Sequence, residues 1–325
     1  MVWFRRINFA AVVLCFVVVV FGAYVRLNNA GLGCPDWPGC YGQLTVPEAA
    51  HEVAAAQQSY PQKPVEAPKA WKEMIHRYLA TTLGSLIVLL ALIAWWRRDL
   101  PLPRGLALGV LGTVLLQGAL GALTVLWQVN PLTVTAHLLT GLTTLLLLFW
   151  MWLSVSPAAP AAAPKVLMPL ATVALALLVL QIFLGGWTSS NYAALGCPDF
   201  PTCHGSWLPE TDLHEAFTLW RGLGVNYEGG VLDNRARVTI HLIHRIGALA
   251  VTLVLGWLAL RLARAGRRPL AAAVIAALLL QLGIAISMVK LQFPLDLADA
   301  HNAGAALLLL ALAAVNFAVR RPEAA

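Results

Sequence analysis

Residues 33–40 read Gly-Cys-Pro-Asp-Trp-Pro-Gly-Cys, and residues 196–203 read Gly-Cys-Pro-Asp-Phe-Pro-Thr-Cys, 163 positions later. Each copy follows an apolar run that ends in a pair of small residues, Gly22-Ala23 in one case and Gly185-Gly186 in the other. Each copy also precedes a long polar loop and then a His-Arg dipeptide. Self-similarity at a fixed spacing indicates a repeated architecture, so the chain is predicted to contain two copies of one unit.

The composition predicts a membrane protein. Of the 325 residues, 59% are hydrophobic and only 11% are charged, and the mean hydropathy is +0.74, whereas a soluble domain has about 25% charged residues. Eight apolar runs reach the ~20 residues that cross a bilayer, and continuous runs of this length form helices. They lie near residues 8–26, 73–96, 104–127, 132–153, 166–188, 238–262, 268–289 and 297–319. The predicted fold is an all-α integral membrane protein with eight transmembrane helices.

The charged residues predict the orientation of these spans. If Met1 is cytoplasmic, the inner segments hold many Arg and Lys residues but only two acids, Asp99 and Glu323, whereas the outer segments hold more acids than bases. Because short cytoplasmic loops are rich in Lys and Arg, both termini are predicted to be cytoplasmic. The net charge of +7 is then explained by the Arg and Lys residues that set the orientation in the membrane. No nucleic-acid partner is expected.

The chain is predicted to divide at residues 154–165, a Ser-, Pro- and Ala-rich segment that is typical of an extended linker. The N-terminal half covers residues 1–153 and the C-terminal half covers residues 166–325, with four spans in each. Gln117 and Gln281 occupy matched positions in the two halves. Repeats with an even number of helices run parallel, so the halves are predicted to be two pseudo-symmetric four-helix bundles related by an axis along the membrane normal.

Four of the five cysteines form the two repeated pairs, and both pairs fall in outer loops on this topology. Disulfides persist outside the cytoplasm, so Cys34–Cys40 and Cys197–Cys203 are predicted disulfides, each worth about 2 kcal/mol for a closed loop of this size. Because strained bridges are labile, a redox-active pair that relays electrons is the alternative to a structural role. Cys15 lies inside the first apolar run and is predicted to be a packing residue.

The histidines are the strongest candidates for chemistry. His76 matches His244 and His137 matches His301, and all four are predicted near the outer ends of their helices. Facing histidines in a four-helix bundle can bind both axial positions of a haem iron, so the sequence predicts two such sites, one in each half. A single histidine of this kind could be a hydrogen-bonded core residue, but the matched set favours a functional role, as does its place inside a membrane span.

The two halves differ three residues before the first histidine of each pair, where Glu73 in the first half becomes His241 in the second. Positions three apart share a helix face, so Glu73 is expected to face the first pocket, where it could transfer protons. The alternatives are a carboxylate favoured by the helix dipole and, for His241, an interfacial histidine. Arg77 and Arg245 follow the histidines and are candidates to bind cofactor propionates, with solvated interfacial arginines as the alternative.

Together these features resemble the haem A synthase family. The resemblance is carried by two four-helix repeats, the doubled Cys-Pro-Asp-aromatic-Pro-x-Cys loop, Glu73-x-x-His76, His137, His244-Arg245 and His301. The paired outer-loop cysteines resemble the bacterial branch of the family, which implies a location in the bacterial cytoplasmic membrane. Residues 48–69 form an Ala-, Gln- and Pro-rich insert for which neither the sequence nor the resemblance suggests a role.

The resemblance implies an oxidoreductase that oxidises the C8 methyl group of haem O to a formyl group by successive hydroxylations, making haem A for terminal oxidases. It implies a haem b cofactor between His244 and His301 in the second half. It also implies a substrate pocket in the first half, with His76 and His137 near the iron of haem O and Glu73 required for activity. The implied partners are haem O, membrane lipid, an electron carrier and the farnesyl-transferring haem O synthase.

Two other classes of protein would use some of the same residues. A di-haem b electron-transfer cytochrome would use the same four histidines, but its haems usually lie at opposite membrane faces, whereas these histidines are all predicted on the outer side. A thiol-oxidising membrane enzyme would use the two cysteine pairs directly and would need no haem.

Overall fold

The computed structural model describes residues 1–322, and this range is helical, with no β-strand beyond two isolated bridges in the loops. Eight helices are long and apolar enough to span a membrane. They are α1 (Val2–Leu27), α3 (Ala67–Trp96), α4 (Arg104–Leu126), α5 (Pro131–Val155), α6 (Met168–Ser190, preceded by a 3-10 turn at Lys165–Leu167), α8 (Asn234–Arg264), α9 (Arg268–Lys290) and α10 (Leu295–Ala318). The predicted all-α membrane fold with eight spans is confirmed.

Three of the spans begin at least four residues earlier than the hydropathy predicts, and one of them is α1, which begins at Val2 and not near residue 8. Helix α3 begins at Ala67 and not near residue 73, because Pro68 suits the first turn of a helix. Helix α8 begins at Asn234 and not near residue 238, because the side chain of Asp233 accepts a 2.8 Å hydrogen bond from the backbone N–H of Ala236 and caps the helix. Hydropathy marks only the apolar part of a helix, so it does not predict polar first turns that project beyond the bilayer.

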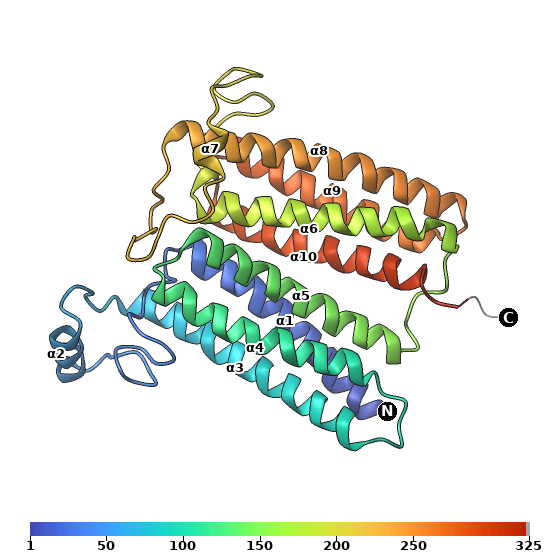
Figure 1. The fold of residues 1–325 in the computed structure, drawn as a ribbon, viewed down its shortest axis with the longest axis horizontal. Helices are drawn as coiled ribbons and strands as arrows, with labels where there is room; N and C mark the ends of the chain where they lie inside the picture. Colours follow the sequence, from blue (N-terminus) through green and yellow to red (C-terminus); the bar gives the residue numbers. More distant parts are fainter. Residues whose placement is uncertain (323–325) are drawn as a thin grey trace.

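The spans form two rings of four helices, which lie side by side in Figure 1. In the first ring α1 and α4 each contact both α3 and α5, and in the second ring α6 and α9 each contact both α8 and α10. The rings meet where α10 contacts α1 and α5, and where α5 contacts α6. The order of neighbours is thus the same in both halves, which agrees with two four-helix bundles, while the symmetry axis between them stays a prediction.

Both ends of the described chain lie at one end of the bundle, and the two long loops lie at the other, which is called the loop end here (Figure 1). The linker at 154–165 packs against the C-terminal end of α10, since the backbone N–H of Ala163 donates to the carbonyl oxygen of Ala318 (2.9 Å). Glu323, one of the two acids expected on the inner side, lies outside the described residues. Having both ends on one side is what an even number of spans requires.

Apolar side chains fill the space between the helices. Leu145, Leu148, Leu255 and Leu258 are fully buried and belong to one cluster that runs through both rings. In lipid the association of helices depends on such close packing, because the tails of the lipid are as apolar as the side chains. Cys15 is 2% exposed and has no disulfide partner within residues 1–322, which confirms that it is a packing residue.

The insert at residues 48–69 contains the short helix α2 (Ala50–Ser59), which lies at the far tip of the loop end (Figure 1). The side chain of Glu52 accepts hydrogen bonds from the backbone N–H groups of Glu48 and Ala49 (3.1 Å each) and so caps this helix. Tyr60, directly after α2, packs edge to face on Tyr41, with ring centroids 5.6 Å apart. The insert therefore packs against the first cysteine loop.

Candidate functional site

Both predicted disulfides, Cys34–Cys40 and Cys197–Cys203, are present. All four cysteines are at most 1% exposed. Thiol–disulfide exchange requires that an attacking thiolate reach one of the sulfur atoms. Their burial therefore favours the structural alternative over a redox-active pair.

Both cysteine loops are built around the aspartate of the motif. The carboxylate of Asp36 accepts hydrogen bonds from the backbone N–H groups of Tyr41 (2.6 Å) and Gly42 (2.7 Å). Tyr41 and Gly42 both have positive φ angles, 53° and 75°, a conformation that glycine adopts without strain. The second loop repeats this turn at the matched residues, including a positive φ of 73° at Gly205. The motif therefore extends two residues past the second cysteine, to the matched glycines Gly42 and Gly205, which the sequence prediction did not include.

In the second loop Asp199 accepts hydrogen bonds from the hydroxyl group of Thr202 (2.5 Å) and from the backbone N–H groups of His204 (2.6 Å) and Gly205 (2.9 Å). These donors stabilise the carboxylate and lower the pKa of Asp199 from 3.8 to about 2. A carboxyl group whose folded pKa is depressed contributes stability above its unfolded pKa and loses it as the pH falls through the folded value. The loop should therefore keep these bonds at pH 7 and lose them between about pH 4 and pH 2.

We predict that Asp199→Asn opens the second loop already at pH 7, because the amide replaces one acceptor oxygen with a donor. Hydrogen exchange at the backbone amides of His204 and Gly205 measures this opening, and both should exchange faster in the variant than in the wild type. The amides of Tyr41 and Gly42, in the unchanged first loop, are the internal control. Equal exchange in variant and wild type would show that the carboxylate does not hold the loop.

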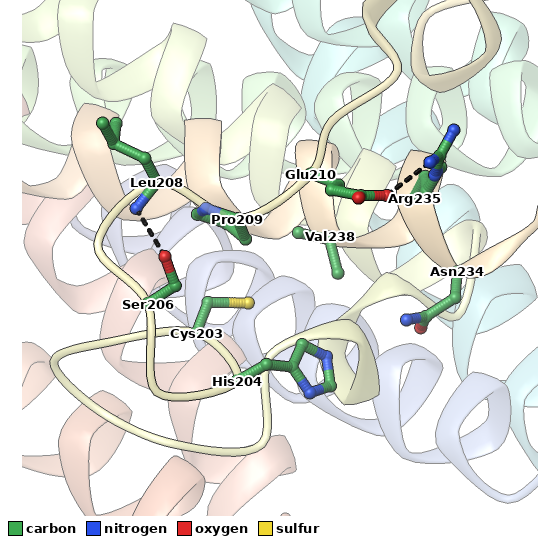
Figure 2. Close-up of a pocket in the computed structure, with 9 residues that line it drawn as sticks. All are labelled: Cys203, His204, Ser206, Leu208, Pro209, Glu210, Asn234, Arg235 and Val238. Atoms are coloured by element: carbon green, nitrogen blue, oxygen red, sulfur yellow. Dashed lines mark hydrogen bonds and ion pairs between the residues drawn. The ribbon is translucent and has the colours of Figure 1, made fainter.

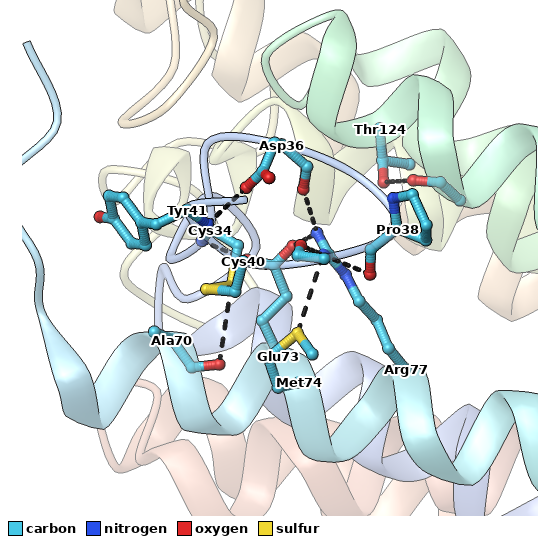
Figure 3. Close-up of polar contacts among 12 residues, drawn as sticks. Cys34, Asp36, Pro38, Cys40, Tyr41, Ala70, Glu73, Met74, Arg77 and Thr124 are labelled. Atoms are coloured by element: carbon cyan, nitrogen blue, oxygen red, sulfur yellow. Dashed lines mark hydrogen bonds and ion pairs between the residues drawn. A yellow bond between two sulfur atoms is a disulfide. The ribbon is translucent and has the colours of Figure 1, made fainter. Parts of the chain in front are cut away.

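The first loop is held on α3 by Arg77, as Figure 3 shows. Its guanidinium group donates to the carbonyl oxygens of Asp36 (3.0 Å), Pro38 (3.3 Å) and Gly39, and forms an ion pair with Glu73. The pair is nearly buried, with side-chain exposures of 13% for Arg77 and 6% for Glu73. Arg77 thus joins the loop to the helix that carries His76.

The carboxylate of Glu73 also accepts a hydrogen bond from the backbone N–H of Cys34 (2.9 Å). Its hydrogen-bond partners in the described chain therefore come from the cysteine loop and from Arg77. Sequence reasoning placed Glu73 one helical turn from His76 but gave no sign of these contacts, since Cys34 lies 39 positions away in the chain.

The second loop is held on α8 in the same way. Arg245 donates to the carbonyl oxygens of Cys197 (3.1 Å), Asp199 (2.8 Å) and Thr202 (2.9 Å). In place of a carboxylate, its Nε donates to Nε2 of His241 (3.2 Å). The loop is thus held in both halves, but only the first half uses an acid to do so. That Arg77 and Arg245 bind propionates stays a prediction, and the structure gives both guanidinium groups these further partners.

The first histidine of each pair lies against a glycine of the neighbouring helix. A Cβ atom on Gly22 of α1 would come within 2.8 Å of Cε1 of His76, and one on Gly185 of α6 would come within 3.2 Å of Cε1 of His244. Such distances leave little or no room for a side chain. The small residues at the end of each apolar run, noted in the sequence, are therefore explained by the space that the imidazole rings occupy.

The second histidine of each pair contacts the matched glutamine. Nε2 of Gln117 lies 3.2 Å from Nε2 of His137, and Nε2 of Gln281 lies 3.1 Å from Nδ1 of His301. The sequence showed that these glutamines match but assigned them no role. They fix the rings of the two histidines from the adjacent helix.

The second half has one further contact that the first half lacks. Nε2 of Gln181 donates to the backbone carbonyl oxygen of His244 (2.9 Å) and lies 3.1 Å from Nδ1 of the same residue. A Cβ atom on Gly247 would come within 2.1 Å of Oε1 of Gln181, so this glycine makes the contact possible. The matched residues of the first half are Val18 and Leu79, which provide neither the amide nor the space.

The imidazole rings of His244 and His301 are neighbours, with centroids 6.5 Å apart and planes at 77° to each other. Two imidazoles on opposite sides of one metal ion, each bonded at about 2 Å, have centroids roughly 6 Å apart, so this pair fits the two axial positions of a haem iron. In the first half Nδ1 of His76 and of His137 are buried and have no hydrogen-bond partner in the described chain. Buried polar atoms are normally paired, so these nitrogens also fit a site completed by a ligand.

A cavity of about 370 Å³ lies elsewhere, beside the second cysteine loop (Figure 2). It is lined by Cys203, His204 and Pro209, among others, and an ion pair between Glu210 and Arg235 lies at its edge. None of the four matched histidines lines it. This cavity is therefore separate from the candidate site.

Comparison with known proteins gives one consistent result. Residues 5–313 match the COX15-CtaA family model, which is described as a cytochrome oxidase assembly protein. The chain is 43% identical over 319 residues to a "Heme A synthase" from Shewanella oneidensis, covering 97% of this chain and 95% of the relative. It is 28% identical to a "Heme A synthase" from Rhizorhabdus wittichii, covering 96% and 92% of the two chains, and 30% identical to one from Methylobacterium radiotolerans, covering 96% and 88%.

Proposed function

The chain belongs to the COX15-CtaA family of cytochrome oxidase assembly proteins, and from this membership we propose that it oxidises haem O to haem A in a bacterial membrane. The observation that carries the division of labour is the asymmetry of two otherwise matched histidine sites. In the first ring an acid, Glu73, lies one helical turn before the first histidine and is bonded to Arg77 and the cysteine loop, and the ring nitrogens Nδ1 of both histidines are unpartnered in the described chain. The second ring has an additional glutamine that fixes its first histidine.

In this proposal the second ring holds haem b permanently. His244 and His301 would hold its iron, and Gln181 and Gln281 fix the two imidazole rings. Hydrogen bonds to the ligating histidines orient them and tune the bound metal. When bound, haem b supplies one-electron transfer to or from the substrate haem.

The first ring takes haem O as its substrate in this proposal. His76 and His137 lie near its iron, and the buried carboxylate of Glu73 accepts protons that leave as the C8 methyl group is oxidised. Arg77 and the N–H of Cys34 fix the position of that carboxylate. In each of two successive hydroxylations the methyl group takes up oxygen from one water molecule and releases two protons and two electrons, and the electrons leave to an electron carrier outside the chain. The resulting hydrated aldehyde loses water to form the formyl group.

The cysteine loops have a structural role in this account. Each loop covers the end of the helix that carries the first histidine, and each disulfide is buried beneath it. Both termini are proposed to be cytoplasmic, which places the loops and both haem sites on the outer side. A reporter enzyme that is active only in the cytoplasm, fused to the C-terminus, tests this orientation.

The function is tested by expressing the chain in bacteria that make haem O but have no haem A synthase of their own. Extracted haems are separated by chromatography and identified by mass. Haem A in cells that carry the chain, and its absence in cells that carry an empty vector, is the expected result. Unchanged haem O in both strains would contradict the proposed function.

We predict that Gln181→Val, which copies the matched residue of the first half, weakens haem b binding by about 10- to 100-fold, the usual effect of removing a residue that supports a metal ligand. Haem b that remains after purification in dilute detergent is the measurement. Gly247→Leu should act in the same direction, because its side chain would displace Gln181. Gln117→Leu, which removes a glutamine that contacts a histidine of the first ring, is the control and should leave haem b in place. Full haem b content in Gln181→Val would show that the glutamine only satisfies a backbone carbonyl.

A further inference from the structure

The two rings differ most clearly at the loop end, just beyond the first histidine of each pair. In the second ring this position is occupied by Trp187 of α6 and Ile240 of α8, which are 1% and 0% exposed. They belong to a buried apolar cluster with residues of the second loop, and Nε1 of Trp187 donates to the carbonyl oxygen of Ala216 (2.9 Å). An apolar plug thus closes the second ring above His244.

The matched residues of the first ring are polar. Tyr24 of α1 stands where the second ring has Trp187, and Lys72 of α3 stands where it has Ile240. Lys72 is half-buried, and its Nζ donates to Oδ1 of Asn28 (2.8 Å) and lies 5.5 Å from the centre of the Tyr24 ring. The first ring therefore has a polar rim at the place where the second ring has a plug.

Within residues 1–322, Lys72 is a cation without a carboxylate partner. Among the described residues its polar contacts are Asn28 and the face of Tyr24, whereas the neighbouring cations of α3, Lys69 and Arg77, form ion pairs with Glu66 and Glu73. A half-buried ammonium group that has only neutral partners is suited to bind an anionic group of a ligand, because a charged partner strengthens its hydrogen bonds.

The position of Lys72 relates it to the first histidine site. Lys72 and His76 are four residues apart on α3 and so lie on the same face of the helix. On α1 the ring of Phe21 lies 6.3 Å from the ring of His76 and 5.8 Å from that of Tyr24. Phe21 and Tyr24 thus form a row of aromatic rings between His76 and Lys72.

A tetrapyrrole has the matching chemistry, since its ring is flat and apolar and one edge carries two propionate carboxylates. Arg77 is less suited to meet them, because its guanidinium group already binds three carbonyl oxygens and Glu73. The second ring has no cation at the position matched to Lys72, and its plug leaves no polar rim there.

We propose that Lys72 binds a propionate of the substrate haem at the loop end of the first ring, and that the plug of Trp187 and Ile240 prevents the same entry into the second ring. This inference rests on the proposed function, since it assigns the substrate to the first ring. It explains how two similar sites can differ in haem exchange. The first site admits and releases a haem, and the second site retains one.

The test compares haem O with haem O dimethyl ester, in which both carboxylates are neutral. Each is titrated into purified full-length protein that already contains haem b, and binding is followed by absorbance. The wild type should bind the free acid about 10- to 100-fold more tightly than the ester, the range expected for one charge-assisted hydrogen bond. In Lys72→Met this preference should disappear, while haem b content, the internal control for folding, is unchanged. Lys290→Met removes an exposed cation at the end of α9 and should keep the preference.

Three outcomes separate this inference from the proposed function. If Lys72→Met still prefers the free acid as the wild type does, Lys72 is not the propionate partner. If the wild type binds neither haem O nor its ester, the proposed function itself is contradicted. If Lys72→Met loses haem b as well, two further variants are compared. The preference for the free acid should remain in Lys72→Arg, which keeps the charge, and should vanish in Lys72→Gln. Equal behaviour of these two variants would overturn the inference.

Discussion

Replacing His301 with alanine is expected to lower haem b retention by more than roughly 100-fold, since even residues that only support a ligand cost 10- to 100-fold when they are removed. The ring centroids of His301 and His244 are 6.5 Å apart, and in the proposed site the loss of either would leave the haem iron with one protein ligand. His137→Ala, the matched change in the first ring, should leave haem b in place but abolish haem A formation. Haem content and haem A yield are measured on the same preparations.

The matched pair of variants makes this prediction specific to one ring. Both changes remove one imidazole at the same depth and the same place in a four-helix ring, so a general loss of packing should affect the two alike. If His137→Ala lost haem b and His301→Ala kept it, the assignment of cofactor and substrate rings would be reversed. If each variant lost half of the haem b, the chain would hold a haem b in each ring, as a di-haem cytochrome does.

The second large effect is expected at Glu73. Glu73→Gln should lower the rate of haem A formation by about 10²- to 10⁴-fold, the usual contribution of a positioned acid or base, while haem b stays bound in the second ring. The carboxylate also pairs with Arg77 in a nearly buried site, and removing one partner of a buried ion pair costs about 3–5 kcal/mol of stability. A loss of activity in this one variant could therefore reflect a displaced cysteine loop.

Glu73→His separates the two explanations, because the second ring already shows that a histidine at this position supports the loop. There Nε2 of His241 accepts a hydrogen bond from Arg245, which still binds three loop carbonyl oxygens. Glu73→His should therefore keep its disulfide and its haem b and still form almost no haem A. Near-normal activity in this variant would show that Glu73 acts only by holding the loop. Glu66→Gln, at the exposed start of the same helix, is the control and should be fully active.

The sequence predicts the membrane-spanning helices and both disulfides because each of these features depends on residues that are close together in the chain. An apolar run of sufficient length must be a helix in lipid, and the repeated motif brings Cys34 and Cys40 within one short loop. The matched histidines were also visible, since His137 and His301 stand at the same place in their repeats. What these features share is that identity and spacing along the chain are enough to define them.

The contacts that distinguish the two rings could not be predicted in this way. Arg77 reads as an interfacial cation in the sequence, and only the fold shows that a loop some 40 residues away covers it. The contact of Gln181 with His244 depends on the space at Gly247, which lies on another helix. A repeat is recognised by residues that are equal in the two halves, whereas the proposed role of Lys72 depends on a difference, since its counterpart is Ile240.

The central claim is that one ring holds a permanent cofactor and the other an exchangeable substrate, and haem analysis of the purified protein tests it most directly. The protein is prepared from a host that supplies haem O, and its haems are extracted, separated and identified by mass. We expect haem B together with haem O, haem A or a hydroxylated intermediate. Haem B alone, at two molecules per chain, would contradict the claim and would indicate a di-haem electron-transfer cytochrome.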